Sequence, residues 1–430
     1  MLKKLKQNSF LRDIGITTLG QVVLMLLAFG INKIICVNLS MEDFAVYNII
    51  RRATSVITYA MLMAMGIAVP KYLAMAKAEE NKEKFSKYLI ASIEIVTVMS
   101  SVVAVLISVA RLPVAKLIFS EDALAYVSLI FPMALYAVGC AFTTYVYSYY
   151  RAVGAFVKYS VSQIALQIFM LVSCIVLGAN LQAIIYVWGV GSCIYSVASV
   201  IIFLKRDGDK EILHDRKKLK PYRRELIEYG LPRVPGEVFL FAYNLVPLLI
   251  ITDKFGLIDS SFFSVATGIN STITSLFGFV GVVLLPEVSK SIVNRQLNNV
   301  NKKINVLLAL YVALSLMAIG FVELFPKFVV HVLYQSEYEA AIPMIRIIIW
   351  SILPNALYLL YRNPLDAISK FPYNTVCLGI SFGLMVIAML SAKTLVACEM
   401  IYVLSYLCLG IFSWLIWQIT LKREIQRNMG

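Results

Sequence analysis

Long apolar runs recur along the whole chain, each about 20 residues long and separated by short polar segments. An α-helix rises 1.5 Å per residue, so a run of this length crosses a hydrocarbon core of about 30 Å. We identify twelve such runs: Ile14–Val37, Phe44–Val69, Tyr88–Ala110, Ala123–Tyr149, Tyr159–Leu177, Ala183–Leu204, Leu231–Thr252, Phe262–Leu285, Val306–Phe325, Ala341–Leu360, Thr375–Ala392 and Thr394–Ile419. An open sheet would leave unpaired backbone groups in lipid. The pattern therefore predicts an all-α integral membrane protein with twelve transmembrane helices.

The longest polar segment, KRDGDKEILHDRKKLKPYRRELIE, separates the first six runs from the last six. It predicts an N-terminal lobe over residues 1–204, a basic linker over 205–228 and a C-terminal lobe over 229–430. Several sequence features recur in order in the two halves. The matched positions are Leu39–Phe44 with Leu257–Phe262, Pro70 with Pro286, Tyr150-Arg151 with Tyr361-Arg362, and Lys158 with Lys370. The halves are thus predicted to be two pseudo-symmetric six-helix lobes, a common plan among transporters.

The net charge of +14 is distributed unevenly across the predicted spans. Of the 39 Lys and Arg residues, 29 fall on the side of the two termini, 5 on the opposite side and 5 within the spans. Basic residues concentrate on the cytoplasmic side of membrane proteins, so we predict a multi-pass protein of the cell's inner membrane with both termini cytoplasmic. The basic excess then indicates contact with anionic membrane lipids, not nucleic acid.

Two of the five cations within the spans are adjacent, Arg51 and Arg52 in the second run. A charge at the centre of a membrane helix costs about 2.5–3.5 kcal/mol, so such a pair indicates a polar cavity, a counter-charge or an anionic ligand. Asn48, Ser55 and other polar residues follow at helical spacing. This broad polar face favours a water-filled cavity over arginines that reach outward to the lipid head groups. The internal repeat places Ile269 and Asn270 at the matching positions, so the cations belong to the N-terminal lobe alone.

Other charged residues near the spans form a second set of candidates. Arg233 and Glu237 are four apart in the irregular segment LPRVPGEVF, where they could form an ion pair or Glu237 could bind a coupling ion. Arg346 follows Glu337 and Glu339, which favours a surface ion pair over cavity lining. Glu94 and Glu399 are lone acids in apolar runs, either neutral and packed or ion-coupling, whereas Asp253 and Lys254 are expected to be solvated.

The sequence carries no sign of an enzyme. It has no Gly-rich phosphate loop and no Ser-His-Asp arrangement. The seven cysteines lack metal-ligand spacing, and His214 and His331 lie far apart, so we predict no catalytic residues, no metal and no cofactor. A gradient of H⁺ or Na⁺ is a candidate energy source.

Five blocks of the chain resemble polysaccharide-biosynthesis flippases of the O-antigen type. These proteins are the oligosaccharide-lipid branch of the multidrug/oligosaccharidyl-lipid/polysaccharide (MOP) exporter superfamily. The blocks are LRDIGITTLGQVV, LSMEDFAVYNII, YYRAVGAFVKYS, EYGLPRVPGEV and LYQSEYEAAIPMIRIIIWSILPNAL. The resemblance extends over essentially the full length and rests on the order of the blocks, none of which is a strict signature.

This resemblance implies two six-helix lobes that form a V around a cationic cavity. It also implies alternating access that carries an undecaprenyl-diphosphate-linked oligosaccharide from the inner to the outer leaflet, for O-antigen or capsule assembly. Arg51, Arg52, Arg233 and Arg346 would be cavity cations, and Asp253 stands where the family often has an acid. Glycosyltransferases and a glycan polymerase would act before and after the flippase.

Three alternatives differ in what the sequence should contain. A multidrug exporter of the same superfamily moves organic cations and would place acids, not arginines, in its N-terminal cavity. A membrane glycan polymerase would need a sizeable outer loop, and the predicted outer loops are short. A lipid II or sporulation-type flippase often carries extra spans beyond these twelve.

Overall fold

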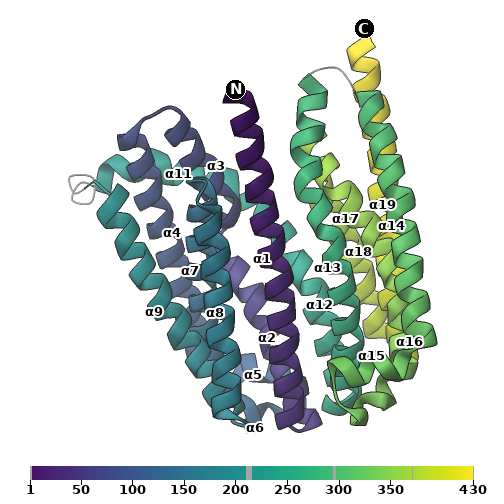
Figure 1. Ribbon diagram of the computed structural model, residues 1–430. Coiled ribbons are helices and arrows are strands. Elements are labelled where there is room, and N and C mark those ends of the chain that lie inside the picture. Colours follow the sequence, from purple (N-terminus) through teal and green to yellow (C-terminus); the bar gives the residue numbers. More distant parts are fainter. Residues whose placement is uncertain (1, 210–215, 294–296, 370, 430) are drawn as a thin grey trace. The chain divides into compact units, whose positions relative to one another are not determined.

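The computed structural model describes residues 2–209, 216–293, 297–369 and 371–429, and of some stretches, above all 2–18 and 278–300, it describes the backbone alone (Figure 1). Helices make up nearly all of these residues, and none of them lies in a β-strand. The chain divides into two compact units, Met1–Phe241 and Ala242–Gly430. The division falls inside one helix, α12 (Val234–Phe255), and the domain limits drawn from the sequence stay a prediction.

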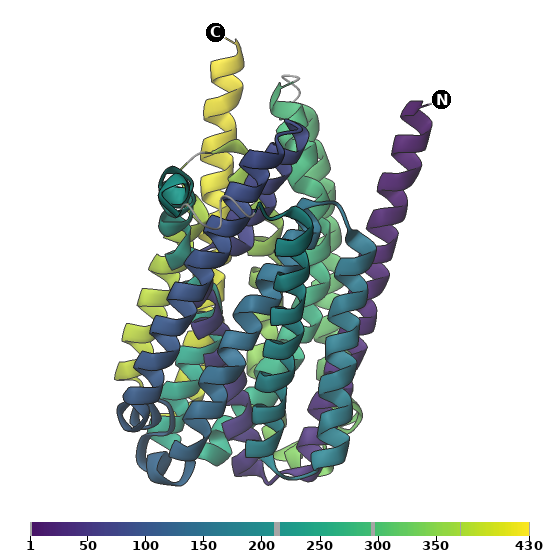
Figure 2. The same cartoon turned by 90° about the vertical axis from the view of Figure 1, so that its left-hand side faces the viewer.

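The N-terminal unit contains the helices drawn from purple to teal in Figures 1 and 2. They are α1 (Leu2–Asn38), α2 (Met41–Leu62), α3 (Met65–Ala78), α4 (Lys82–Val109), α5 (Arg111–Phe119), α6 (Ala123–Tyr126), α7 (Ile130–Ala152), α8 (Phe156–Leu177), α9 (Leu181–Asp207) and α11 (Lys220–Gly230), followed by the start of α12. Short polar side chains begin several of them. Ser40, Asn81 and Asn180 accept hydrogen bonds from the first free backbone N–H groups of α2, α4 and α9.

Small residues bring the helices of this unit close together. A Cβ added to Gly139 of α7 would lie 2.6 Å from Ser192 Cβ, and one added to Gly189 of α9 would lie 2.9 Å from Tyr136 N. In a bilayer, an apolar side chain gains no hydrophobic free energy when it moves from lipid to a helix interface. Membrane helices therefore associate through close van der Waals contact, which small residues permit. Helix α9 therefore packs tightly along α7, while α8 packs along α1.

The second predicted span is broken. Helices α2 and α3 meet at an angle of 42°, and the residues between them, Met63 and Ala64, both have positive φ, at 47° and 58°. Residues other than glycine rarely adopt this left-handed backbone conformation, so the surrounding structure must hold the two residues in place. Gly230 at the end of α11 permits a close approach, since a Cβ there would lie 2.7 Å from the carbonyl oxygen of Met63.

A second irregularity follows six residues after Ala64, at Pro70 inside α3. Proline has no N–H, so the carbonyl oxygen of Gly66, four residues earlier, loses its helical hydrogen bond. Two side chains of α7 donate to this oxygen instead, Arg151 Nη2 at 2.9 Å and Ser148 Oγ at 3.3 Å. Arg151 Nη2 also lies 3.0 Å from Ser148 Oγ. Arg151, the arginine of the repeated Tyr-Arg pair, therefore satisfies a backbone carbonyl group of α3 that Pro70 leaves without its helical hydrogen bond.

The C-terminal unit is drawn from teal-green to yellow in Figure 1. After α12 come α13 (Leu257–Val293), α14 (Leu297–Leu324), α15 (Pro326–Leu333), α16 (Ile342–Ile348), α17 (Ile352–Ile368), α18 (Tyr373–Ser391) and α19 (Leu395–Met429). Helix α17 packs against both α13 and α19, and a Cβ on Gly410 of α19 would lie 2.6 Å from the carbonyl oxygen of Pro354. Gly256, with φ of 88°, forms the tight turn between α12 and α13.

All twelve predicted apolar runs fall on helices. Ten helical stretches among the described residues are long and apolar enough to cross a membrane, and the bent pair α2–α3 makes eleven. The remaining run, Phe262–Leu285, lies within α13. The prediction of an all-α membrane protein is confirmed.

Candidate functional site

Arg51 lies on α2 and is held by residues of its own helix and of α1. Its Nη1 atom donates to Asn32 Oδ1 at 3.0 Å, and the hydroxyl of Tyr47 donates to the same oxygen at 3.3 Å. The guanidinium carbon also lies 5.8 Å from the centroid of the Tyr47 ring. Asn32 and Tyr47 therefore fix the direction of the Arg51 side chain without neutralising its charge, since both are uncharged.

Arg52 is more buried than Arg51, with an exposed fraction of 9%. Arg51 is half-buried and hydrogen-bonded within the unit. This burial disagrees with arginines that reach outward to lipid head groups. Two guanidinium groups, each with several N–H donors, therefore lie among helices of the N-terminal unit at adjacent positions.

The polar face of α2 is less open than its sequence pattern predicted. Asn48 is buried and its Nδ2 donates to the carbonyl oxygen of Phe44 at 2.8 Å. Thr58 is buried too and donates to the carbonyl oxygen of Ala137 on α7, at 3.4 Å. Ser55 is half-buried and donates to the carbonyl oxygen of Arg51, at 3.1 Å. Much of this polarity therefore satisfies backbone groups, and the arginines remain the main charged feature of the face.

A second cationic cluster surrounds Tyr229, at the end of α11. Arg233 donates from Nη1 to the carbonyl oxygen of Tyr229 at 2.8 Å, and its guanidinium carbon lies 4.0 Å from the centroid of that ring. Lys71 Nζ, from α3, lies at the same distance from the centroid. Sequence reasoning missed Lys71 and Tyr229. The conspicuous Pro70-Lys71 pair was a signal, but nothing in the sequence places it beside residue 229.

Arg346 is exposed and pairs with a residue that the sequence did not suggest. Its Nε atom lies 3.5 Å from Glu323 Oε2, at the end of α14, and Trp350 donates to the other oxygen of the same carboxylate. Of the two acids proposed as partners, Glu339 instead contacts Lys327 and His331, at 2.9 and 2.7 Å. The surface ion pair is present with a corrected partner, because the tertiary structure brings the end of α14 within reach of Arg346.

The acidic candidates occupy different environments. Glu94 is not a lone acid, since Arg223 of α11 donates to its Oε2 from two nitrogens, both at 2.7 Å. Asp253 is exposed as expected, but Lys254 is not simply solvated: its Nζ lies 2.6–3.0 Å from the carbonyl oxygens of Met389, Leu390 and Ala392, at the end of α18.

Two further acids remain, Glu399 and Glu237. Glu399 is buried in α19, with an exposed fraction of 3%, and Glu237 is half-buried at the start of α12. No group of three or more His, Cys, Asp or Glu side chains in the described ranges could hold a metal ion. Of the acidic candidates, Glu94 and Glu237 belong to the N-terminal unit, and Asp253 and Glu399 belong to the C-terminal unit.

Solved structures identify the fold as that of the MATE transporters of the MOP superfamily. An inward-facing multidrug-resistance MATE transporter matches with a TM-score of 0.77 at 14% identity, over 94% of this chain and 95% of the other. A MOP superfamily transporter from Pyrococcus furiosus matches at 0.68 and 13%, over 96% and 95%. A eukaryotic MATE transporter matches at 0.67 and 12%, over 97% and 100%.

The particular family follows from the sequence. A profile described as polysaccharide biosynthesis protein matches residues 10–292. The chain therefore belongs to the polysaccharide biosynthesis protein family, and its family and fold are those of membrane transporters and flippases. No curated protein matches the chain. The predicted family and the fold of twelve membrane helices in two lobes are confirmed.

Proposed function

We propose that the chain is a flippase that moves an undecaprenyl-diphosphate-linked oligosaccharide from the inner to the outer leaflet by alternating access. The observation that carries this proposal is the pair Arg51 and Arg52, buried or half-buried on α2 in a member of the polysaccharide biosynthesis family. We assign the pair to the diphosphate. Asn48 and Ser55 lie on the same helix, but both donate to backbone carbonyls, so they serve the site mainly by shaping it.

The chemistry of the arginine pair suits a diphosphate. A guanidinium group offers planar paired N–H donors that match phosphate oxygens, and it remains charged at any physiological pH. The membrane potential, negative inside, favours outward movement of an anion by about 2.3 kcal/mol per charge per 100 mV. A transporter that moves an anion outward therefore needs less coupling to an ion gradient than an exporter of cations does.

The neighbouring structures supply one further argument. The Pyrococcus furiosus transporter of the MOP superfamily is described by a reverse polarity of its binding pocket that suggests a different function. Pocket polarity thus changes with function on this fold. Arginines in place of acids favour an anionic substrate here and count against the multidrug exporter of organic cations.

The remaining assignments extend the same proposal. We place both termini in the cytoplasm of a cell with the chain in its inner membrane, because of the distribution of basic residues. Arg233, with Lys71 beside Tyr229, is a second contact for the head group. Arg346, paired with Glu323, is a weaker candidate. If H⁺ or Na⁺ is coupled, buried Glu399 is the first acid to test, ahead of Glu237, ion-paired Glu94 and exposed Asp253.

The proposal is tested with Arg51→Ala/Arg52→Ala in cells that depend on the chain for surface glycan. We expect normal insertion, loss of surface glycan and accumulation of lipid-linked oligosaccharide in the inner leaflet, because the diphosphate loses its charged donors. Arg111→Ala/Lys116→Ala is the matched control, since it also removes two cations but from exposed positions on α5. Arg51→Lys/Arg52→Lys keeps both positive charges but removes the planar paired N–H donors, and this variant should export glycan at an intermediate rate.

Normal surface glycan in the double alanine variant would refute the diphosphate site. Efflux of organic cation dyes by the wild type, lost on removal of an acid such as Glu399, would instead support the multidrug exporter. The two outcomes are distinguishable because one assay measures export of glycan and the other measures efflux of a cationic dye.

A further inference from the structure

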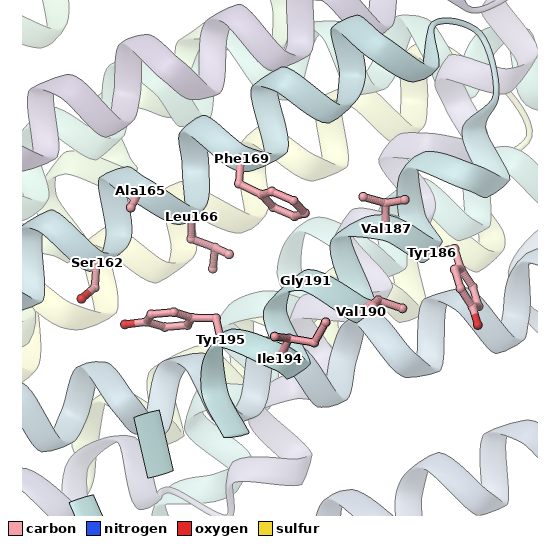
Figure 3. Close-up of a pocket in the computed structure, with 10 residues that line it drawn as sticks. All are labelled: Ser162, Ala165, Leu166, Phe169, Tyr186, Val187, Val190, Gly191, Ile194 and Tyr195. Carbon is pink, nitrogen blue, oxygen red and sulfur yellow. The ribbon is translucent and has the colours of Figure 1, made fainter. Parts of the chain in front are cut away.

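A groove opens between α8 and α9 in the N-terminal unit, on a surface that the proposed transport function does not use (Figure 3). Its volume is about 540 Å³. It is lined by Ser162, Ala165, Leu166 and Phe169 of α8 and by Tyr186, Val187, Val190, Gly191, Ile194 and Tyr195 of α9. Nearly all of this lining is apolar.

The packing of the two helices explains why the groove exists. Helix α8 lies along α1, where Gly20 and Gly30 admit Ser160 and Leu171, while α9 is drawn toward α7 at Gly139 and Gly189. The two helices remain connected at one end by the turn after Gly178, and Trp188 Nε1 donates to Ser173 Oγ at 2.8 Å. Between these two connections and the start of α8, helix α8 packs on α1 and helix α9 packs on α7, so the space between α8 and α9 stays open.

The surroundings of the groove exclude water as its occupant. The flanking residues on both helices are large, apolar and exposed: Val161, Ile168, Val172, Val197 and Ile201. In a membrane protein such a surface faces hydrocarbon. A water molecule needs two to four polar partners, which the apolar stretch lined by Leu166, Phe169 and Val190 does not offer, and an empty groove would forfeit dispersion contacts. Hydrocarbon is therefore the material that fits.

One end of the groove differs from the rest. Figure 3 shows Ser162 and the hydroxyl of Tyr195 at the same end, with Phe169, Val187 and Tyr186 toward the other. Lys158 lies four residues before Ser162, on the same face of α8, and its side chain is exposed. A positive charge beyond the Ser162 hydroxyl, next to an apolar channel, matches an amphiphile with an anionic head and one long chain.

We propose that this groove binds one acyl chain of an anionic membrane phospholipid, with the phosphate of its head group beside Lys158. Ser162 and Phe169 of α8 are seven positions apart, which is about 10 Å along the helix axis, so the groove holds a substantial part of one chain. The site lies in the N-terminal unit alone and does not depend on which substrate is transported.

Gly191 provides a sharp way to close the groove. A Cβ at this position would lie 2.3 Å from Cε1 of the Phe169 ring, so the ring rests against α9 only because residue 191 is glycine. Gly191→Ala should displace the ring and obstruct the groove. Ala165→Phe fills it from α8 without touching the contact with Gly191, and Ile201→Phe is the control, because Ile201 is apolar and exposed but lies outside the lining.

The experiment measures lipid retained by the full chain after purification in detergent, by native mass spectrometry with added phosphatidylglycerol or phosphatidylcholine. We expect the wild type and Ile201→Phe to retain phosphatidylglycerol, and Ala165→Phe and Gly191→Ala to lose it. Lys158→Gln should retain both lipids but reduce the preference for phosphatidylglycerol by about fivefold, the contribution of one basic residue near a membrane surface.

Two results would overturn the proposal. Equal retention by the wild type and Ala165→Phe would show that the bound lipid lies elsewhere. Displacement of phosphatidylglycerol by a polyprenyl phosphate at equal concentration would assign the groove to an isoprenoid chain instead. Thermal unfolding of each variant in detergent identifies a misfolded protein, and the Ala165→Phe variant keeps the test valid if Gly191→Ala fails to fold.

Discussion

The second span of the N-terminal unit and its counterpart in the C-terminal unit show how two related halves differ. In the first, α2 and α3 are broken at Met63 and Ala64 and bend by 42°, whereas α13 runs as a single helix from Leu257 to Val293. The first carries Arg51 and Arg52 where the second has Ile269 and Asn270. Asn270 is buried and donates from Nδ2 to Ser351 Oγ on the adjoining segment, at 2.7 Å.

This difference shows which features belong to the shared scaffold. The Nδ2 atom of Asn270 donates to one hydroxyl of a neighbouring segment, and its Oδ1 atom is buried without a hydrogen-bond partner among the described residues. A guanidinium needs more partners, and the N-terminal unit supplies Asn32 of α1 as an acceptor and the ring of Tyr47 of α2, whose centroid lies 5.8 Å from the guanidinium carbon. Both halves thus have a helical span at this position, and local differences in sequence decide whether the span bends and whether it carries charge.

The largest effect is expected from moving the charges to the other unit, with Ile269→Arg/Asn270→Arg. Both positions are buried, with exposed fractions of 1% and 2%, and a charge inside a membrane helix costs about 2.5–3.5 kcal/mol. We expect little folded protein, measured by size-exclusion chromatography in detergent. The reciprocal control, Arg51→Ile/Arg52→Asn, should fold normally and fail to export glycan. Normal yield of the first variant would mean that the two units tolerate charge equally.

A smaller effect is expected from the broken span itself. Arg151→Ala/Ser148→Ala leaves the carbonyl oxygen of Gly66 without either side-chain donor, which we expect to cost about 1–3 kcal/mol. Pro70→Ala restores an N–H four residues along the helix and should recover much of the lost stability. The measurement is the midpoint of thermal unfolding in detergent for the double alanine variant, for Pro70→Ala and for the triple variant that combines them. An absence of recovery would place the role of Arg151 elsewhere.

The smallest effect concerns Lys254, which contacts three carbonyl oxygens at the end of α18 in the C-terminal unit. A cation at a helix C-terminus contributes about 0.3–1 kcal/mol. Lys254→Met should lower the unfolding midpoint slightly, and Lys393→Met, an adjacent cation outside this contact, should leave it unchanged. An equal change in both variants would indicate a general effect of surface charge.

The locations of the spans and the unusual position of Arg51 and Arg52 could be predicted from the sequence. Hydropathy and helical spacing are local properties, so neighbours along the chain carry the information. The partners of charged side chains could not be predicted. Glu94 and Arg223 are 129 residues apart, and the sequence offered no reason to join them. Arg346 was assigned to nearby acids, whereas its partner, Glu323, lies on a different helix.

The sequence by itself therefore determined the class of protein, its membrane helices and the presence of a costly charge pair, because each depends on residues close together in the chain. Only the tertiary structure decided that Arg151 completes the backbone at Pro70, that Lys71 and Arg233 share one tyrosine ring, and that α8 and α9 leave an apolar groove. These features arise where helices distant in sequence pack together, and their geometry is set by glycines and prolines whose effect depends on the neighbour they meet.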